Sequence, residues 1–444
     1  MTGNKKNNHE VSIDDVNFIL DECVRLATLS STGIKNIPPM ESLWTLPHPS
    51  GSGSMICGRA AKKRLADLSL EALRRSGLER QITVSTISKP LESLFVRWFI
   101  KDRRLVERKQ VDRLLSAAAK QAKTKLVTET YFIPCHLMGT SSKDLFTIGP
   151  ITFHDKNSFR KLLLKNSPKS KQSKQDAQQH ERSLLAKAIL YYRNFQWIAE
   201  VTISNCDKKT SSEVSVYAVT AALNCLHLLL GFKHTGRMRV GGFALKTDKR
   251  AELKLCSQGK LKTTLTYAYF GHVEYPENWS EILDTDRWKS WSSLLNILLE
   301  AAVNPQLRRP LSIRFLDAVQ WFGEACRDES ASTRTIKFIT AVERLLTTGE
   351  HDNVSRMIEE RTANLCLMSG ANRQEWKAKA RKAYNYRSEL LHGSMSPRDE
   401  EAMSGAYLAA EVAQEVMLSA LNAFSEKGLL SETVNEISLI EWFN

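Results

Sequence analysis

The segment Tyr384–Ser394, which reads YNYRSELLHGS, places an arginine inside the apolar stripe of a helix. Arg387 falls on the same helical face as residues that recur at three- and four-residue spacing, namely Trp376, Ala380, Ala383, Leu390 and Leu391. A guanidinium on such a face needs an anion beside it. The helix must therefore pair Arg387 with an acid of the fold or present it to an anionic ligand.

The residues after this helix predict a tight stop and a new start. Gly393 suits a left-handed position, Ser396 an N-cap, and Pro397 the first position of the next helix. His392 then lies at a helix C-terminus, where the dipole favours the imidazolium and proton exchange near neutral pH is feasible. The alternative is structural: His392 caps the last carbonyls, and Arg387 pairs with a core carboxylate.

Two segments in this order resemble the Apea-like group of HEPN domains. The first is Arg334–Leu346, with Glu343 in its Ala-Val-Glu, followed by Ser355–Leu367; the second is Arg387, four residues, His392 and a glycine. The likeness covers about residues 285–430, roughly the last third of the chain.

The resemblance implies an all-helical domain that forms a homodimer in which the Arg and His motifs of two subunits face each other. It also implies metal-independent RNA cleavage, often in toxin or antiphage defence systems. On this basis Arg387 binds phosphate, Ser388 is the polar residue after it, and His392 is catalytic. Many members of the family carry Asn, Asp or His where this chain has Ser388.

RNA carries its own nucleophile, the ribose 2′-hydroxyl. A nuclease therefore needs a group that moves protons and a cation that stabilises the phosphorane. Histidine and arginine fit these tasks. The expected products are a 2′,3′-cyclic phosphate and a 5′-hydroxyl, and DNA is not cut. The other hypothesis is a noncatalytic HEPN dimer that binds RNA, nucleotide or a partner protein as a sensor or regulator.

Glu343 is a second charge near an apolar stripe, formed by Ile336, Ile339, Val342 and Leu346. Either it orients a basic residue, with Arg387 and Arg361 as the candidates, or it lies at the edge of the stripe in solvent. We expect Glu343, Tyr384 and Ser388 to support the site.

With 63 Lys and Arg against 49 Asp and Glu, the 444-residue chain has a net charge of +14. Such an excess favours polyanions such as RNA, although a basic surface without a special role also explains it. The length predicts two domains. We expect an α+β recognition or regulatory region over residues 1–284 and an all-α HEPN helical bundle over 285–444.

The eight cysteines are scattered, without a Cys-x-x-Cys pair or a zinc-like cluster. We therefore expect reduced thiols, no metal and no cofactor. The first residues lack a signal-peptide pattern, and no apolar run reaches the length of a spanning helix. These features predict a cytoplasmic protein without a membrane partner. The resemblance to toxin and defence systems also leaves an antitoxin or a phage-derived trigger open as a partner.

The N-terminal region mixes patterns. Residues 11–29, 60–75, 91–125 and 214–230 predict helices, and 128–154 and 197–204 predict strands. Residues 164–182 read as a basic mobile loop, either a solvated linker or an RNA contact.

Residues 233–262 show an alternating, strand-like pattern with a turn at 257–260 and few acids. Basic residues two apart share one sheet face, and nearby aromatics suit base stacking. This face either binds RNA or is an ordinary solvated sheet. Its candidate RNA-binding residues are Lys233, Arg237, Arg239, Lys254, Lys260 and Lys262.

Overall fold

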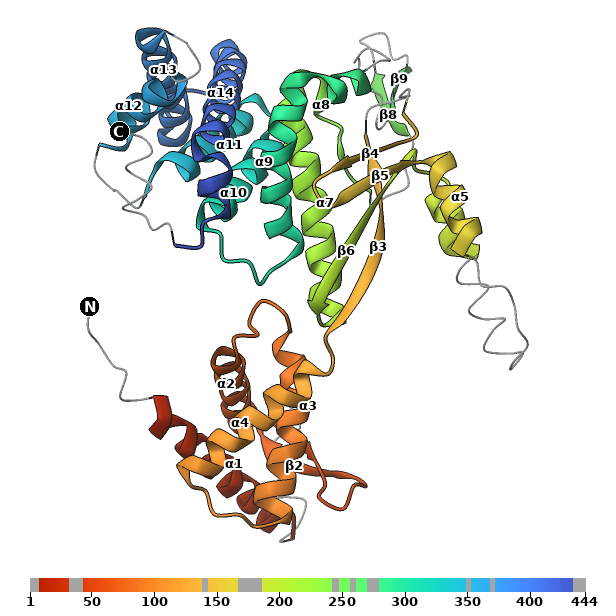
Figure 1. The fold of residues 1–444 in the computed structure, drawn as a ribbon, viewed down its shortest axis with the longest axis vertical. Helices are drawn as coiled ribbons and strands as arrows, with labels where there is room; N and C mark the ends of the chain where they lie inside the picture. The colour runs from red at the N-terminus through yellow and green to blue at the C-terminus, as the bar shows by residue number, and fades with distance from the viewer. Residues whose placement is uncertain are drawn as a thin grey trace. The chain divides into compact units, whose positions relative to one another are not determined.

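The computed structural model describes residues 8–31, 43–137, 143–166, 186–241, 247–255, 261–269, 279–348, 353–367 and 372–433 (Figure 1). The chain forms two compact units. The first unit comprises residues 1–129 and 204–213, and the second comprises 130–203 and 214–444. The N-terminal region is therefore α+β, and the C-terminal region is mostly helical.

The first unit packs helices against a small hairpin. Its elements are α1 (Asn8–Ser31), β1 (Leu43–Pro47), β2 (Ser54–Gly58), α2 (Arg59–Ser76), α3 (Val84–Phe95), the π-helix η3 (Val96–Lys101) and α4 (Arg108–Lys123). β1 and β2 are antiparallel. The apolar faces of α2, α3 and α4 meet in one core that includes Leu65, Leu91, Phe95 and Leu114.

The prediction of one continuous helix over 91–125 was wrong. The chain leaves the helical path after η3, where Arg103 has a φ of 50°, and restarts at Arg108. This break lets α3 and α4 pack against each other, so both apolar faces bury in the same core. The tertiary gain outweighs the local helical preference.

Residues 204–213 complete the first unit through Asp207. Its carboxylate accepts hydrogen bonds from the backbone N–H of Thr83, at 2.8 Å, and from the Thr86 hydroxyl, at 2.5 Å. Both donors belong to the N-terminal end of α3, where an anion is favoured. Burial alone would raise the pKa of Asp207, but these hydrogen bonds outweigh it and bring the pKa to about 2.

The second unit begins with a five-stranded sheet in the order β4-β5-β6-β3-β7. Its strands are β3 (Val127–His136), β4 (Leu145–Ile148), β5 (Ile151–Asp155), β6 (Trp197–Cys206) and β7 (Arg239–Val240), with α5 (Lys156–Asn166) after β5. The predicted strands in 128–154 and 197–204 are confirmed. Phe146 stacks on Phe153 and makes T-shaped contacts with Trp197 and Trp279, which forms an aromatic core on the sheet.

Helix α7 (Lys208–Leu230) follows the sheet, and α8 (Phe232–Thr235) follows α7. Within the described residues, α7 is the one helix long and apolar enough to cross a membrane, yet 67% of its apolar window is buried in the protein. That burial is typical of a core helix of a soluble protein.

Six helices follow the 3-10 turn η4 (Trp279–Asp284) in the described chain and form the C-terminal helical region (Figure 1). They are α9 (Asp286–Val303), α10 (Pro310–Arg327), α11 (Ala331–Leu346), α12 (Val354–Leu367), α13 (Arg373–His392) and α14 (Glu400–Leu430). Thr285 caps α9 by accepting from the Trp288 N–H at 3.2 Å. The predicted boundary at 284/285 thus lies inside the second unit, where sheet gives way to helices.

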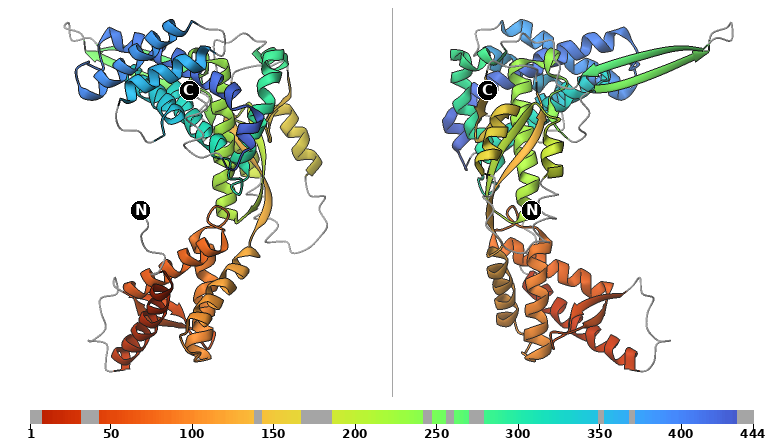
Figure 2. Two further views of the ribbon diagram at one scale, coloured as in Figure 1. Left: turned by 60° about the vertical axis from the view of Figure 1, so that its left-hand side comes forward. Right: turned by 90° about the vertical axis from the view of Figure 1, so that its right-hand side faces the viewer.

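The basic segment 233–262 is only partly strand. Lys233–Thr235 is helical, in contrast to the prediction, because Thr235 bonds back to the Gly231 carbonyl at 2.7 Å. Strands β8 (Thr247–Leu255) and β9 (Leu261–Tyr269) pair as an antiparallel ribbon (Figure 2). The predicted turn at 257–260 lies outside the described residues.

The predicted loop at 164–182 begins inside a helix. Residues 164–166 form the last turn of α5, because the Leu-rich start of the tract continues its helical pattern. Residues 167–182 lie outside the described residues.

Candidate functional site

Helix α13 begins and ends as its sequence indicates. The Asn372 side chain caps its first turn by accepting from the Gln374 N–H at 3.0 Å. Gly393 follows its last residue with a φ of 76°, a left-handed conformation that favours glycine. His392 is therefore the final residue of α13, as predicted.

The next helix starts later than predicted. α14 begins at Glu400 with Asp399 as its N-cap, rather than at Pro397 after Ser396. Asp399 accepts a hydrogen bond from the Ser396 N–H at 2.9 Å, and the Ser396 hydroxyl accepts from the Arg398 N–H at 3.2 Å. These hydrogen bonds close a turn that precedes α14, so the connection between His392 and α14 is three residues longer than predicted.

Acids of α12 fix α13 in place. Glu360 pairs with Arg373 at 2.8 Å and also with Lys377, and the buried Glu359 pairs with Arg381 at 2.7 Å. These three ion pairs position the helix that carries Arg387. This network was not predicted. Its signal in the sequence is two adjacent acids on one helix and three bases at four-residue spacing on the next.

Arg387 is held by Glu343 and Tyr384. Its Nη2 lies 3.2 Å from Glu343 Oε2 of α11, and the two side chains are 23% and 19% exposed. Its guanidinium carbon lies 5.5 Å from the centre of the Tyr384 ring, one turn earlier on α13. Tyr384 also hydrogen-bonds Glu343. The structure thus brings three of the predicted site residues into one cluster.

The electrostatics of the cluster follow from its burial. Burial raises the pKa of the Glu343 carboxyl, while the Arg387 guanidinium and the Tyr384 hydrogen bond act in the opposite direction. The pKa of Tyr384 is raised, first by burial and then by the charge of Glu343. Partial burial therefore keeps the ion pair poorly solvated, which strengthens its attraction.

One donor of Arg387 is left over. Its Nε is buried and has no hydrogen-bond partner in the part of the chain that the structure describes. A guanidinium carries five N–H donors, and the hydrogen bond to Glu343 uses one of them. Glu343 accordingly orients Arg387 without saturating it.

Arg361 was the other candidate partner of Glu343. It is buried and donates to the Leu346 carbonyl at the end of α11. Of the two candidates, Arg387 is the one that forms an ion pair with Glu343.

His392 and Ser388 do not join the cluster. His392 is exposed at the end of α13, Ser388 is half-buried, and neither has a hydrogen-bond partner within the described residues. Five helical positions separate Arg387 from His392, which is about 140° around the axis and about 7.5 Å along it. The two side chains leave α13 in different directions.

The predicted RNA-binding residues are spread over several elements. Lys233 belongs to α8, where its ammonium lies 5.7 Å from the centre of the Tyr407 ring on α14. Arg237 follows α8, and Arg239 is in β7 opposite His136. Lys254 and Lys262 face each other in the β8–β9 register, and Lys260 lies outside the described residues.

Large apolar side chains are exposed near His392, a feature the sequence analysis did not identify. Leu391 precedes His392 and is 49% exposed, and Met403, near the start of α14, is 51% exposed. Leu391 had been assigned to the buried stripe of α13, but it lies on the outside. The spacing offered no signal for this, because Leu391 lies four residues after Arg387 and therefore on the same helical face.

The small residues of α14 pack within the subunit. Gly405, Ala406, Ala409, Ala410 and Ala413 are all buried. A Cβ on Gly405 would lie 3.1 Å from the Tyr386 ring, so glycine permits the close approach of α13 and α14. The subunit itself therefore uses this row of small residues to pack α13 against α14.

No group of three His, Cys, Asp or Glu side chains converges as a metal site among the described residues. No family model, no curated protein and no solved structure matches this chain.

Proposed function

We propose that the chain is a HEPN-type endoribonuclease that cuts RNA without a metal ion, as a cytoplasmic toxin or antiphage defence effector. The observation that carries the proposal is the oriented Arg387, held by Glu343 and Tyr384 on the helix that ends in an exposed histidine. Arg387 binds the scissile phosphate, and His392 moves a proton.

The reaction uses the ribose as nucleophile. One histidine takes the proton of the 2′-hydroxyl, whose oxygen attacks phosphorus. Arg387 stabilises the charge of the phosphorane. The bond to the 5′-oxygen breaks, and a second histidine gives that oxygen a proton. The products are a 2′,3′-cyclic phosphate and a 5′-hydroxyl.

The second histidine comes from a second subunit. The divergence of Arg387 and His392 on one helix supports this arrangement, because a partner can supply the missing direction of approach. Leu391 and Met403 support it too, since their exposed apolar surface lies beside His392 in the sequence and on the next helix. The homodimer buries this surface.

The test of cleavage uses purified full-length protein, single-stranded RNA and EDTA. We expect cutting with cyclic phosphate ends, and its loss in His392→Ala and in Arg387→Ala. His48→Ala and Arg398→Ala are matched controls at exposed positions and should cut normally. Activity that vanishes with EDTA and returns with Mg²⁺ would refute the mechanism.

The test of the dimer is sedimentation at micromolar concentration. Met403→Asp should shift the wild-type dimer to monomer and abolish cutting. Leu105→Asp is the matched control, because Leu105 is 74% exposed in the first unit and far along the chain. A fully active wild-type monomer would exclude the two-subunit site.

The second candidate is a noncatalytic HEPN dimer that binds RNA, nucleotide or a partner protein, such as an antitoxin or phage-derived trigger. Ser388 favours it, because this position often carries Asn, Asp or His in the HEPN family. Expression separates the two functions: a nuclease slows growth of the host, and His392→Ala relieves the slowing. Equal growth with both proteins supports the binding function.

A further inference from the structure

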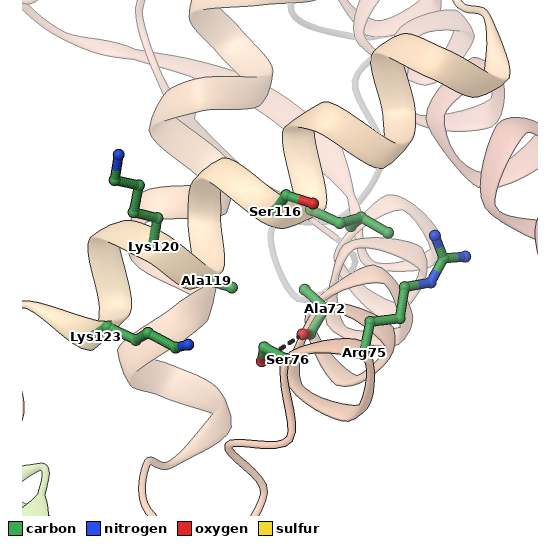
Figure 3. A pocket seen from close by; sticks show the side chains of 8 residues that line it. Ala72, Arg75, Ser76, Ser116, Ala119, Lys120 and Lys123 are labelled. Carbon is green, nitrogen blue, oxygen red and sulfur yellow. Dashed lines mark hydrogen bonds between the residues drawn. The ribbon is translucent and has the colours of Figure 1, made fainter.

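The first unit has a groove between α2 and α4 with a small apolar floor. Ala72 of α2 and Leu115 and Ala119 of α4 form the floor, and the hollow measures about 230 Å³. Figure 3 shows Ala72 and Ala119 facing each other across it. None of the residues that line it within the described chain is aromatic. The groove therefore offers no platform on which a base could stack.

The rims of the groove are basic. Lys123 extends over Ser76, and Lys120 and Arg75 leave the groove on opposite sides (Figure 3). Arg75 pairs with Glu71 at 2.7 Å and with Asp112 at 2.5 Å, so acids already balance its charge. Lys120 and Lys123 have no ion-pair partner among the described residues.

A second hollow continues along α4. Arg108, Lys109 and Arg113 line it with Asp112, and it shares Ser116 with the groove. From Arg108 to Lys123 the helix extends about 22 Å. We call the cations Arg108, Lys109, Arg113, Lys120 and Lys123 the α4 strip. Asp112, which pairs with Arg75, lines the second hollow. It is the one acid among the described residues that line the two hollows.

We propose that the α4 strip binds the phosphate backbone of a nucleic acid. A row of cations over this length matches a polymer with evenly repeated negative charge. Without aromatic side chains the strip contacts phosphate and sugar rather than bases, so binding is independent of sequence. This inference concerns the first unit and does not require the proposed cleavage.

The experiment measures binding of the full-length protein to labelled single-stranded DNA and RNA of mixed sequence by fluorescence anisotropy, over a range of salt. The DNA probe has no 2′-hydroxyl, so the proposed cleavage does not interfere. We compare wild type with Lys120→Glu/Lys123→Glu. The matched control is Arg59→Glu/Lys63→Glu, which makes the same charge change at exposed positions of α2 outside both hollows.

Wild type should bind both probes, and the strip variant should bind them about tenfold more weakly, with a salt slope reduced by about 1.4, because each lost contact to a single strand removes about 0.7. The control should bind as wild type does. Circular dichroism checks that both variants fold.

Equal weakening in both variants would show a diffuse charge effect, and unchanged binding in the strip variant would place the contact elsewhere. Either result overturns the proposal. Competition by polyglutamate as strong as competition by unlabelled DNA would also overturn it, because the strip would then bind an acidic protein. If the strip variant still cleaves saturating RNA, the two proposals stand independently.

Discussion

Arg387 in the C-terminal helical region and Lys123 in the first unit both offer a positive charge, but their surroundings differ in kind. Arg387 is 23% exposed and fixed by a carboxylate and a ring. Lys123 is exposed at the rim of a groove, without an ion-pair partner in the described chain. One cation has a set direction, and the other is free to follow its ligand.

The difference has a physical consequence. A preoriented guanidinium in a poorly solvated setting loses little freedom when it engages phosphate, and it can favour a transition state over a substrate. An exposed ammonium is screened by salt and adds affinity without selecting one geometry. Under the two proposals, the C-terminal helical region carries out the chemistry and the first unit captures the nucleic acid.

The largest expected effect separates these two roles kinetically. At saturating RNA, Arg387→Ala and His392→Ala should each lower kcat by about 10²–10⁴, the range for groups that move protons or stabilise transition-state charge. Lys120→Glu/Lys123→Glu should leave kcat unchanged and raise KM. Single-turnover cleavage at several protein concentrations measures both quantities.

The contrary outcome is equally clear. If the strip variant lowers kcat and leaves KM alone, the first unit takes part in catalysis and the comparison fails. Arg387→Lys sharpens the result, because it keeps the charge and loses the planar fork. We expect it to stay far below wild type.

The end of α13 and the Glu343 pair were readable from the sequence because both rest on local rules. A glycine at a left-handed position stops a helix, and a charge on an apolar stripe requires a countercharge. Arg387 and Glu343 each place a charge near the apolar stripe of its own helix, so an ion pair between them satisfies both charges. The choice between Arg387 and Arg361 as the partner of Glu343 required the structure, since the sequence allowed both.

Other features depend on contacts between segments distant in the sequence. The break near Arg103, the late start of α14 and the groove at Lys123 come from how helices pack or how a turn closes. The sequence analysis drew no function from the cations of the α4 strip, because their spacing is also that of an ordinary solvated helix face. The groove beside Lys120 and Lys123 exists because α2 packs against α4. The periodicity of one helix does not indicate which helix packs beside it.

A second prediction concerns stability. Arg387→Ala should lower the free energy of unfolding by about 2 kcal/mol, because it leaves Glu343 half-buried without its cation; full burial would cost more. Lys120→Ala/Lys123→Ala should change it by less than about 0.5 kcal/mol, as is usual for exposed positions. Urea denaturation followed by circular dichroism measures both. Equal losses would show that exposure does not distinguish the two sites.

The smallest expected effect is a pH dependence that belongs to Glu343. Burial raises the pKa of this carboxyl above its ordinary value of 4.5, so its contribution to stability is complete below that value and is lost as pH rises through the folded pKa. Arg387 opposes the shift. In Arg387→Ala the folded pKa is therefore higher, and the loss of stability on raising the pH is larger.

The urea midpoints of wild type and Arg387→Ala should thus diverge between about pH 4.5 and pH 7. The difference between their free energies of unfolding should grow by about 1 kcal/mol, the equivalent of somewhat less than one unit of pKa. Glu343→Gln has no carboxyl to ionise, so adding Arg387→Ala to it should give a gap that is constant with pH. The groups that act on the pKa of Glu343 are Arg387 and Tyr384, so Lys120→Ala/Lys123→Ala should leave the curve parallel to wild type. Parallel curves for Arg387→Ala as well would mean that the guanidinium does not set the ionisation of Glu343, and the orientation assigned to Arg387 would lose its cause.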